Sequence, residues 1–314
     1  MNRCITLTCL LFFTISSPVL AQTSEPSSLP TQIKFTFNPP DGAKVQTIYT
    51  MIRTKKAEGQ PQITDEVEMK TEGNFIKIKN GFQFHQKTLS SSMRRNGELI
   101  NDPITNLLAQ VPTISVISRD AELIDIEGIG NVAELAKSQF STSEIPAQLL
   151  EILSSMLSKE GIVRREQAEW NARYAEYAGA TIKIGDAFES QAAQALPNGG
   201  EMLYTVRTTF PRWESCHVGH CIRIEQSYSS DDTTALNDMT NNLSKQMMHT
   251  TAPKNSANSH ISGSLSRLID PSTMLIYSER VERTMTLQMP ISDQVILPVV
   301  QQETRSYTYT YEQP

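Results

Sequence analysis

The stretch SCHVGHC, residues 215–221, concentrates two cysteines and two histidines within six consecutive positions. Three kinds of chemistry use these residue types: a disulfide, a metal site and thiol redox catalysis. Redox catalysis typically uses a Cys-x-x-Cys pair at the start of a helix, and this sequence lacks that spacing. The choice therefore lies between a disulfide and a metal site.

A disulfide between Cys216 and Cys221 requires the two residues to meet across a hairpin. If Val218 and Gly219 form the turn, the cysteines become a cross-strand pair with Cα atoms about 4.5 Å apart. That separation is at the short end of the range that disulfides accept. The enclosed loop is small, so the cross-link should contribute roughly 2 kcal/mol. We predict this disulfide.

Metal handling at His217 and His220 is the alternative for the same stretch. A closed metal site needs all four side chains to converge. Adjacent residues of a regular strand point to opposite faces, so the histidines and the cysteines should lie on different sides of the ribbon. We expect no cofactor, and keep these two histidines as weak candidate ligands.

Further chemistry depends on isolated residues, because the sequence contains no nucleophile elbow, zincin helix, phosphate loop or dinucleotide fingerprint. Asp186 in IKIGDAF and Asp270 in LIDPSTM are first of all turn formers. His85 lies in an alternating strand pattern. A hydrolase that uses a carboxylate or histidine pair needs two such groups in one pocket. It stays an alternative, and we assign no catalytic residue.

Three aromatic residues, Trp170, Tyr174 and Tyr177, fall on one face of a helix expected from about 161 to 178. A helix that covers a sheet needs such a stripe as core, and that interpretation is favoured. The same stripe could line an apolar pocket, which makes these residues candidates for ligand binding.

These residues must be positioned by a strand-rich chain of 314 residues with a net charge of −6. Residues 1–21 have the basic start, apolar run and small-residue end of a signal peptide, and 22–31 have the composition of a flexible tether. Export would place the cysteines in an oxidising compartment, periplasmic or extracellular. The acidic balance disfavours nucleic acid and anionic membranes as partners, and no segment beyond the signal is apolar enough to span a membrane.

Period-2 alternation predicts an α+β fold with large antiparallel sheets and a helical segment packed against them. We expect an N-terminal β-rich half at 32–140, a helical connector at 141–179, and a C-terminal β-rich half at 180–314 with a polar insertion at 231–259. The two halves could be similar. The clearest local element is a hairpin at 75–89, with Asn80-Gly81 in its turn.

The segments IKIGDAF and LIDPSTMLIYSERVERTMTL, within residues 180–290, resemble exported bacterial β-rich proteins of unknown function. Ala187 and Met274 depart from that pattern. Long antiparallel strands with helices on one face also look like the half-barrel lipid and lipoprotein carriers of the bacterial envelope. The resemblance implies a fold and assigns no activity.

The combined expectation is a non-enzymatic exported binding or structural protein. It would carry an apolar small molecule or dock an envelope protein.

Overall fold

The computed structural model describes residues 29–101, 106, 109–130, 132–140, 157–195, 201–217, 219–238, 241–242, 259–292 and 295–312. The predicted signal peptide, most of the tether, residues 141–156 of the connector and much of the polar insertion lie outside these ranges. The chain divides into two compact units, Met1–Pro30 and Thr31–Pro314. All elements named below belong to the second unit.

This unit is built mainly of antiparallel strands, which confirms that part of the predicted fold. The helices are α2 (Val132–Phe140) and α4 (Lys159–Arg173), and 234–238 is also helical. The strands are β1 (Gln32–Lys34), β2 (Lys44–Ala57), β3 (Ile63–Ile78), β4 (Gly81–Arg95), β5 (Glu98–Ile100), β6 (Thr113–Ser118), β7 (Leu123–Glu127), β8 (Thr181–Lys183), β9 (Ala187–Ala195), β10 (Glu201–Thr209), β11 (Trp213–Cys216), β12 (Gly219–Asp232), β13 (His260–Ile269), β14 (Ile276–Ser292) and β15 (Val295–Glu312).

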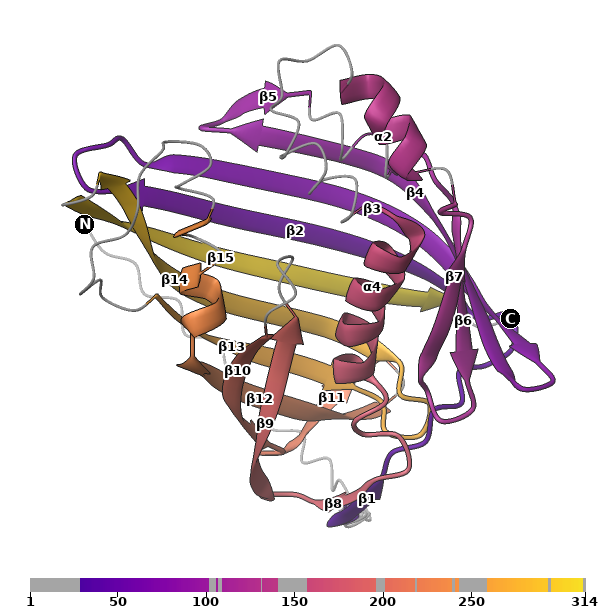
Figure 1. The fold of residues 1–314 in the computed structure, drawn as a ribbon. Coiled ribbons are helices and arrows are strands. Elements are labelled where there is room, and N and C mark those ends of the chain that lie inside the picture. Colours follow the sequence, from indigo (N-terminus) through magenta and orange to yellow (C-terminus); the bar gives the residue numbers. More distant parts are fainter. Residues whose placement is uncertain are drawn as a thin grey trace, which may run out of the picture. The chain divides into compact units, whose positions relative to one another are not determined.

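Within the described ranges, 13 strands form one sheet in the order β7-β6-β4-β3-β2-β15-β14-β13-β12-β10-β9, with β5 on β4 and β11 on β12. β1 and β8 pair separately. The last strand, β15, lies beside β2 in the middle of the sheet (Figure 1). The sheet therefore runs without a break from one predicted half into the other, and the similarity of the halves stays a prediction.

The two faces of the sheet differ in character. On β15, Tyr307, Tyr309 and Tyr311 point toward α4, whereas Thr308 and Thr310 between them are exposed. We call the face that carries α4 the inner face and the opposite one the outer face (Figure 1). This alternation follows from the two-residue period of a strand.

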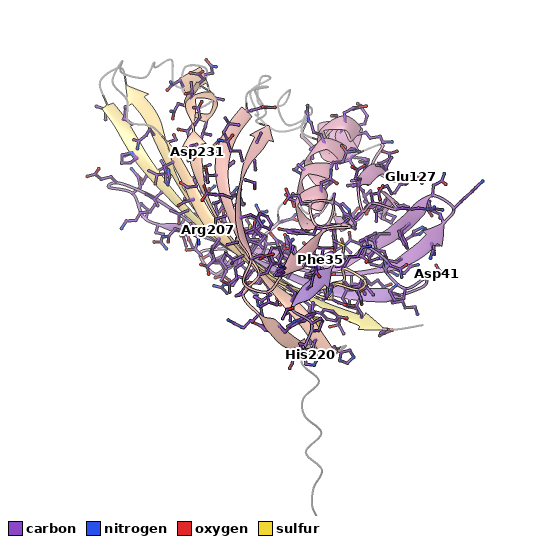
Figure 2. The ribbon with its side chains drawn as sticks, turned by 90° about the horizontal axis from the view of Figure 1, so that it is seen from below. Phe35, Asp41, Glu127, Arg207, His220 and Asp231 are labelled. Atoms are coloured by element: carbon purple, nitrogen blue, oxygen red, sulfur yellow. A yellow bond between two sulfur atoms is a disulfide. The ribbon has the colours of Figure 1, made fainter. Side chains whose placement is uncertain are left out.

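The main core lies where the chain after β1 passes between the sheet and α4. Phe37 meets Phe75, Phe82, Trp170 and Tyr174 edge-on, with ring centroids 5.3 to 6.5 Å apart. Phe35 is fully buried nearby, among the crowded side chains at the centre of Figure 2. Aromatic pairs of this kind contribute about 0.5 to 1.5 kcal/mol beyond area burial, so this cluster anchors α4 to the sheet.

Helix α4 begins at a conventional cap, because the Ser158 side chain accepts a hydrogen bond from the Gly161 amide at 3.0 Å. It ends at Arg173, five residues before the predicted end at 178. The next residues form turns up to Gly179, whose φ is 77° and whose amide donates to the Phe35 carbonyl at 2.9 Å. The helix ends early, and the chain after it pairs with the segment that follows β1. The sequence patterns did not predict α2.

The predicted hairpin of β3 and β4 is confirmed, but its turn was placed one residue late. Ile78 pairs with Gly81, so Lys79 and Asn80 form the turn. Gly81 serves a different purpose: a Cβ there would lie 2.0 Å from the Ile117 carbonyl oxygen, so glycine permits the close approach of β6. The two consecutive positive φ angles of a type I′ turn occur instead at Asn96 and Gly97.

One edge of the sheet is closed by α4. The Gln167 side-chain amide donates to the carbonyls of Leu123 and Ile124 on β7, at 3.2 Å each, and Asn171 accepts from the Leu123 amide at 3.2 Å. These side chains take the place of a further strand and protect the β7 edge. They also fix how α4 lies over the inner face.

Candidate functional site

A cavity of about 160 Å³ lies between α4 and the inner face. Its lining is mixed: Trp170 and Tyr174 at the end of α4 and Tyr307, Tyr309 and Tyr311 on β15 supply aromatic rings, and Thr, Gln, Ser, Glu and Arg side chains supply polar groups. Ligand pockets for whole drug-sized molecules measure about 300 to 1,000 Å³. The cavity is therefore smaller than such a pocket and encloses only part of a molecule of that size.

Hydrogen bonds hold the aromatic walls in place. Trp170 donates from Nε1 to the Ala121 carbonyl at 2.8 Å, and its ring lies 4.4 Å from that of Tyr174. Tyr311 donates from its hydroxyl to the Ile276 carbonyl at 2.9 Å. With these polar atoms satisfied, the two rings are fixed in orientation and present apolar surface to the cavity.

Arg173, the last residue of α4, connects the cavity to a buried ion pair. Its guanidinium lies 4.9 Å from the Tyr307 ring centroid and 3.1 Å from Glu279 Oε1. Arg267 Nε donates to the other oxygen of Glu279 at 2.7 Å, and both side chains of that pair are 1% exposed. Burial alone would raise the pKa of Glu279, but the two guanidinium groups outweigh it and hold the pKa below its usual range.

Five charged residues stand opposite one another across the inner face, one on each of five neighbouring strands. They form what we call the charge row: Arg95 on β4, Asp65 on β3, Arg53 on β2, Glu303 on β15 and Arg283 on β14. The signs alternate, so each residue attracts its neighbours across the strands. Nitrogen to oxygen distances are 2.7 Å for Arg95–Asp65, 2.7 Å for Arg53–Glu303 and 3.1 Å for Arg283–Glu303.

Glu303 is the centre of the charge row. It also accepts from Arg305 Nε at 2.8 Å, so three guanidinium groups share one carboxylate. The Glu303 side chain is 2% exposed, while those of Arg53, Arg283 and Arg305 are 25 to 27% exposed. Burial would raise the pKa of Glu303, but the surrounding arginines hold it below the ordinary value.

The cavity and the charge row are adjacent. Tyr307 lines the cavity, packs against Tyr49 with ring centroids 4.8 Å apart, and lies two residues from Arg305 on the same face of β15. Burial raises the pKa of Tyr49 to about 12, so its phenol stays neutral. The Tyr307 end of the cavity therefore lies next to the arginines around Glu303.

Helix α4 adds two carboxylates, since Glu166 and Glu169 also line the cavity. Burial raises the pKa of Glu166, and the negative charge of Glu169 adds to this effect. Arg165 lies 3.3 Å from Glu166 and opposes the shift.

The structure places the three aromatic candidates differently. Trp170 and Tyr174 line the cavity, whereas Tyr177 is absent from its lining. The Tyr177 hydroxyl accepts from Gln226 Nε2 at 2.8 Å, and its ring lies 5.9 Å from that of Phe35. Tyr177 is a core residue in this arrangement.

The predicted disulfide between Cys216 and Cys221 is confirmed, with a Cα separation of 5.8 Å. The predicted register of its hairpin was wrong, since Cys216 pairs with Gly219 and Cys221 with Glu214. The cysteines are thus diagonal neighbours, and the Cα separation exceeds the expected one. Gly219 has φ of 116°, which lets the strand begin directly after a tight turn.

The histidine pair does not form part of a larger ligand set. Within the described residues there is no group of three or more His, Cys, Asp or Glu side chains that could hold a metal ion. His217 and His220 are exposed, and His220 lies at the rim of the fold in Figure 2. Metal handling by the two histidines stays a hypothesis.

Each candidate acid or base residue is in hydrogen-bond contact with a neighbour two or three positions away in the sequence. Asp186 accepts from the Lys183 amide at 2.7 Å, and Asp270 accepts from the Ser272 amide at 2.9 Å and the Thr273 hydroxyl at 2.7 Å. His85 lies 3.3 Å from Gln83. No hydrogen bond or ion pair links these three to one another, and none of them lines the cavity under α4.

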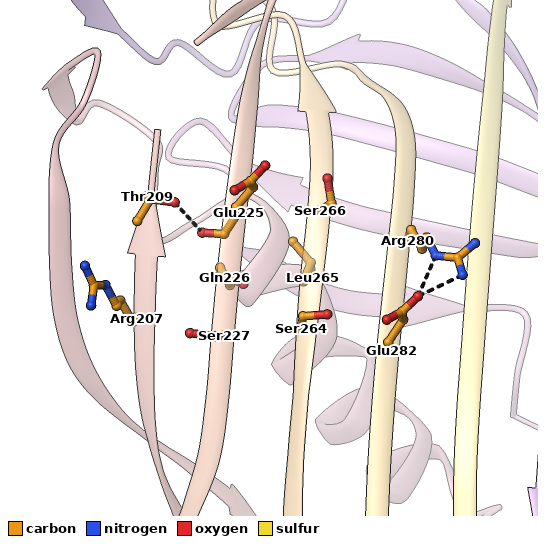
Figure 3. A pocket seen from close by; sticks show the side chains of 10 residues that line it. All are labelled: Arg207, Thr209, Glu225, Gln226, Ser227, Ser264, Leu265, Ser266, Arg280 and Glu282. Atoms are coloured by element: carbon orange, nitrogen blue, oxygen red, sulfur yellow. Dashed lines mark hydrogen bonds and ion pairs between the residues drawn. The ribbon is translucent and has the colours of Figure 1, made fainter. Parts of the chain in front are cut away.

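A larger depression, about 420 Å³, lies on the outer face (Figure 3). Small side chains on β12 and β13, such as Ser227, Ser264 and Ser266, leave it open between longer charged ones. Arg280 and Glu282 at its border pair with each other at 2.8 Å. These exposed groups satisfy one another and are solvated, so we assign no ligand to this depression.

Sequence reasoning missed the charge row, although a signal for it exists. In YSERVERTM, Glu279 and Arg283 are in phase with the apolar residues Val281 and Met285. Strand periodicity therefore places these charges on the apolar face, where charges are buried only when paired. Glu303 and Arg305 are in phase with the three tyrosines of β15 in the same way.

No family model and no curated protein sequence matches this chain. Solved structures with a related arrangement include lipovitellin, from work on lipid-protein interactions in lipovitellin, at 14% identity and a TM-score of 0.46. That match covers 88% of this chain and 26% of the lipovitellin chain, so this chain spans about a quarter of it. A candidate lipoprotein of Parabacteroides distasonis ATCC 8503 matches at 8% identity and a TM-score of 0.22, covering 90% of this chain and 98% of the other. At these scores neither likeness carries a conclusion about function.

No helix in the described ranges is long and apolar enough to cross a membrane.

Proposed function

We propose that this protein is a non-enzymatic, exported binding protein that holds an apolar or amphipathic small molecule beneath α4. The observation that carries the proposal is the cavity between α4 and the inner face, which aromatic side chains line from both the helix and the sheet. Aromatic side chains combined with a small number of polar groups are typical of ligand pockets.

A binding role suits the chemistry of the residues around the cavity. The two most buried carboxylates nearby, Glu279 and Glu303, are each held by arginines at 2.7 to 3.1 Å. Carboxylates with lowered pKa values and several guanidinium partners are poor proton donors or acceptors. Such groups fix geometry and charge, which is what a binding site requires.

Export is supported by the disulfide, since such bonds form and persist in oxidising compartments. The basic, apolar and small-residue pattern of residues 1–21 points the same way. Periplasm and extracellular space both fit.

The test is a fluorescence titration with 1-aminoanthracene, a small neutral apolar probe. Thr47 on β2 lines the cavity and Ile48 beside it is 45% exposed on the outer face, which gives a matched pair of variants. We expect Thr47→Phe to fill the cavity and weaken probe binding at least tenfold, and Ile48→Phe to bind as the wild type does. Near-ultraviolet circular dichroism would check that both variants keep the native packing.

If the wild type does not bind the probe, or if the two variants bind it equally well, the cavity is not the site. Native mass spectrometry of the protein from its own envelope fraction then tests the second candidate role, docking of a protein partner. An extra few hundred daltons removable by organic solvent supports a carried small molecule. The bare oxidised mass supports docking.

A further inference from the structure

The arginines of the charge row outnumber its carboxylates. Counting Arg305, which joins at Glu303, there are four guanidinium groups in contact with two carboxylates, Asp65 and Glu303. The surplus of positive charge lies on the inner face, next to the cavity.

One donor of these arginines is buried and has no acceptor in the protein. Each guanidinium carries five N–H donors. One terminal nitrogen of Arg283 donates a hydrogen bond to Glu303, whereas its Nε is buried and has no hydrogen-bond partner. Buried donors without a partner are rare in folded proteins, and one explanation is an acceptor supplied by a bound molecule.

The surplus of positive charge lies where the polar end of a ligand with an apolar tail would lie. Arg305 is two residues from Tyr307, and a strand advances about 7 Å over two residues. A hydrocarbon chain seated against Tyr307 and Trp170 would therefore present its end to the guanidinium of Arg305, with Arg53 and Arg283 sharing the same carboxylate.

The charge balance of this region must also include the carboxylates on α4. Glu169 interacts electrostatically with Arg173 and Arg305, and Glu166 lines the cavity. Together with Asp65, Glu279 and Glu303 they make five carboxylates. The arginines in contact with these carboxylates, with Arg165 beside Glu166 included, number seven: Arg53, Arg95, Arg165, Arg173, Arg267, Arg283 and Arg305. A surplus of positive charge therefore remains, which an anionic group would reduce.

We propose that the ligand is an amphiphile with a single anionic head group, such as a carboxylate, and that Arg53, Arg283 and Arg305 hold that head. This inference rests on the proposed function, because the tail occupies the cavity under α4. Planar guanidinium groups bind carboxylates and phosphates with paired hydrogen bonds, which suits either head.

The first experiment compares head groups on one tail. Dodecanoate, dodecanol and dodecylamine, each below its micellar concentration, would compete with 1-aminoanthracene on the full chain at pH 8. We expect dodecanoate to bind at least tenfold more tightly than dodecanol, and dodecylamine to bind most weakly. Acetate distinguishes a head-group site from a site for free anions: failure of millimolar acetate to weaken dodecanoate binding supports an amphiphile, and competition by acetate overturns it.

The second experiment uses variants of one residue type on opposite faces of the sheet. Arg305→Gln and Arg283→Gln should weaken dodecanoate binding about tenfold and leave dodecanol binding unchanged. Arg280→Gln, on the outer face of β14 and paired with Glu282, is the control and should change neither. Loss of binding for both ligands in the inner variants would indicate a structural role and contradict the proposal.

The outcomes separate this inference from the proposed function. Equal affinity of the wild type for dodecanoate and dodecanol would refute the anionic head while the binding function stands. Absence of any probe binding would refute both. If Arg305→Gln does not fold, Arg305→Lys keeps the charge and should retain most of the preference for dodecanoate, and the wild-type head-group series decides the question without any variant.

Discussion

Two ion pairs of the same chemistry, one joining β13 to β14 and one within β14, lie in opposite surroundings. Arg267 and Glu279 meet on the inner face with 1% of each side chain exposed, whereas Arg280 and Glu282 meet on the outer face with 59% and 51% exposed. The inner pair had to be removed from water, which is costly unless both partners are fully bonded. The outer pair stays solvated and contributes little. Position within the two-residue period of the strand, rather than residue type, sets the energetic weight of a charge here.

The strongest test of this comparison is to remove one carboxylate from each pair. Glu279→Gln leaves Arg267 and Arg173 without their shared charge in the protein interior, so we expect the free energy of unfolding to fall by about 3 to 5 kcal/mol. Glu282→Gln, three residues along, should change it by less than about 0.5 kcal/mol. Urea denaturation followed by circular dichroism measures both. Similar losses for the two variants would mean that burial is not what separates the faces.

The hairpin of β11 and β12 also combines buried and exposed side chains, with smaller expected effects on stability. Cys221 is fully buried against the core, while His217 and His220 are exposed. We expect Cys216→Ala with Cys221→Ala to lower the free energy of unfolding by about 2 kcal/mol, because the closed loop is short.

The matched control is His217→Ala with His220→Ala, which we expect to stay within about 0.5 kcal/mol of the wild type. Thermal unfolding with and without reductant checks both pairs. A large loss in the histidine variant, restored by added Zn²⁺, would revive the metal hypothesis.

Strand periodicity predicted the strand-rich antiparallel fold and the hairpin of β3 and β4. It worked because each strand has one apolar and one polar face, which gives a strong period-2 signal. The turn at Lys79-Asn80 was placed one residue late because Gly81 is required by the neighbouring strand β6 and not by the turn itself. A single sequence does not reveal which neighbour approaches a glycine.

The candidate site was predicted only in part. Trp170 and Tyr174 were recognised from helical spacing, but whether they enclose space or fill it depends on how far α4 stands from β15. The charge row depends on register across five strands. Register is a property of pairs of strands, and the pattern within one strand shows only which residues share a face.

The stability that acid removes should come chiefly from the inner face. The pKa values of Glu279 and Glu303 are depressed in the folded protein, so their stabilisation is complete above their unfolded pKa, near 4.5, and is lost as the pH falls through the lower folded values. Each unit of depression is worth about 1.4 kcal/mol. We expect the melting temperature to decrease between pH 5 and pH 3.

The control is the Glu303→Gln variant, whose melting temperature should depend less on pH over that range than that of the wild type. An identical pH dependence in both proteins would mean that Glu303 does not keep a low pKa in the folded state.

The smallest expected effect concerns the outer depression, where Arg280→Gln removes a charge at its border. The Arg280 side chain is 59% exposed and its pair with Glu282 is screened by water and salt, so the free energy of unfolding should change by less than about 0.5 kcal/mol. Arg283→Gln, three residues further on the inner face, should cost more, because it removes a guanidinium held at 3.1 Å by the buried Glu303. Parallel urea titrations of the two variants measure the difference. If Arg280→Gln costs as much as Arg283→Gln, the outer face is not simply solvated, and the depression in Figure 3 would become a second candidate site.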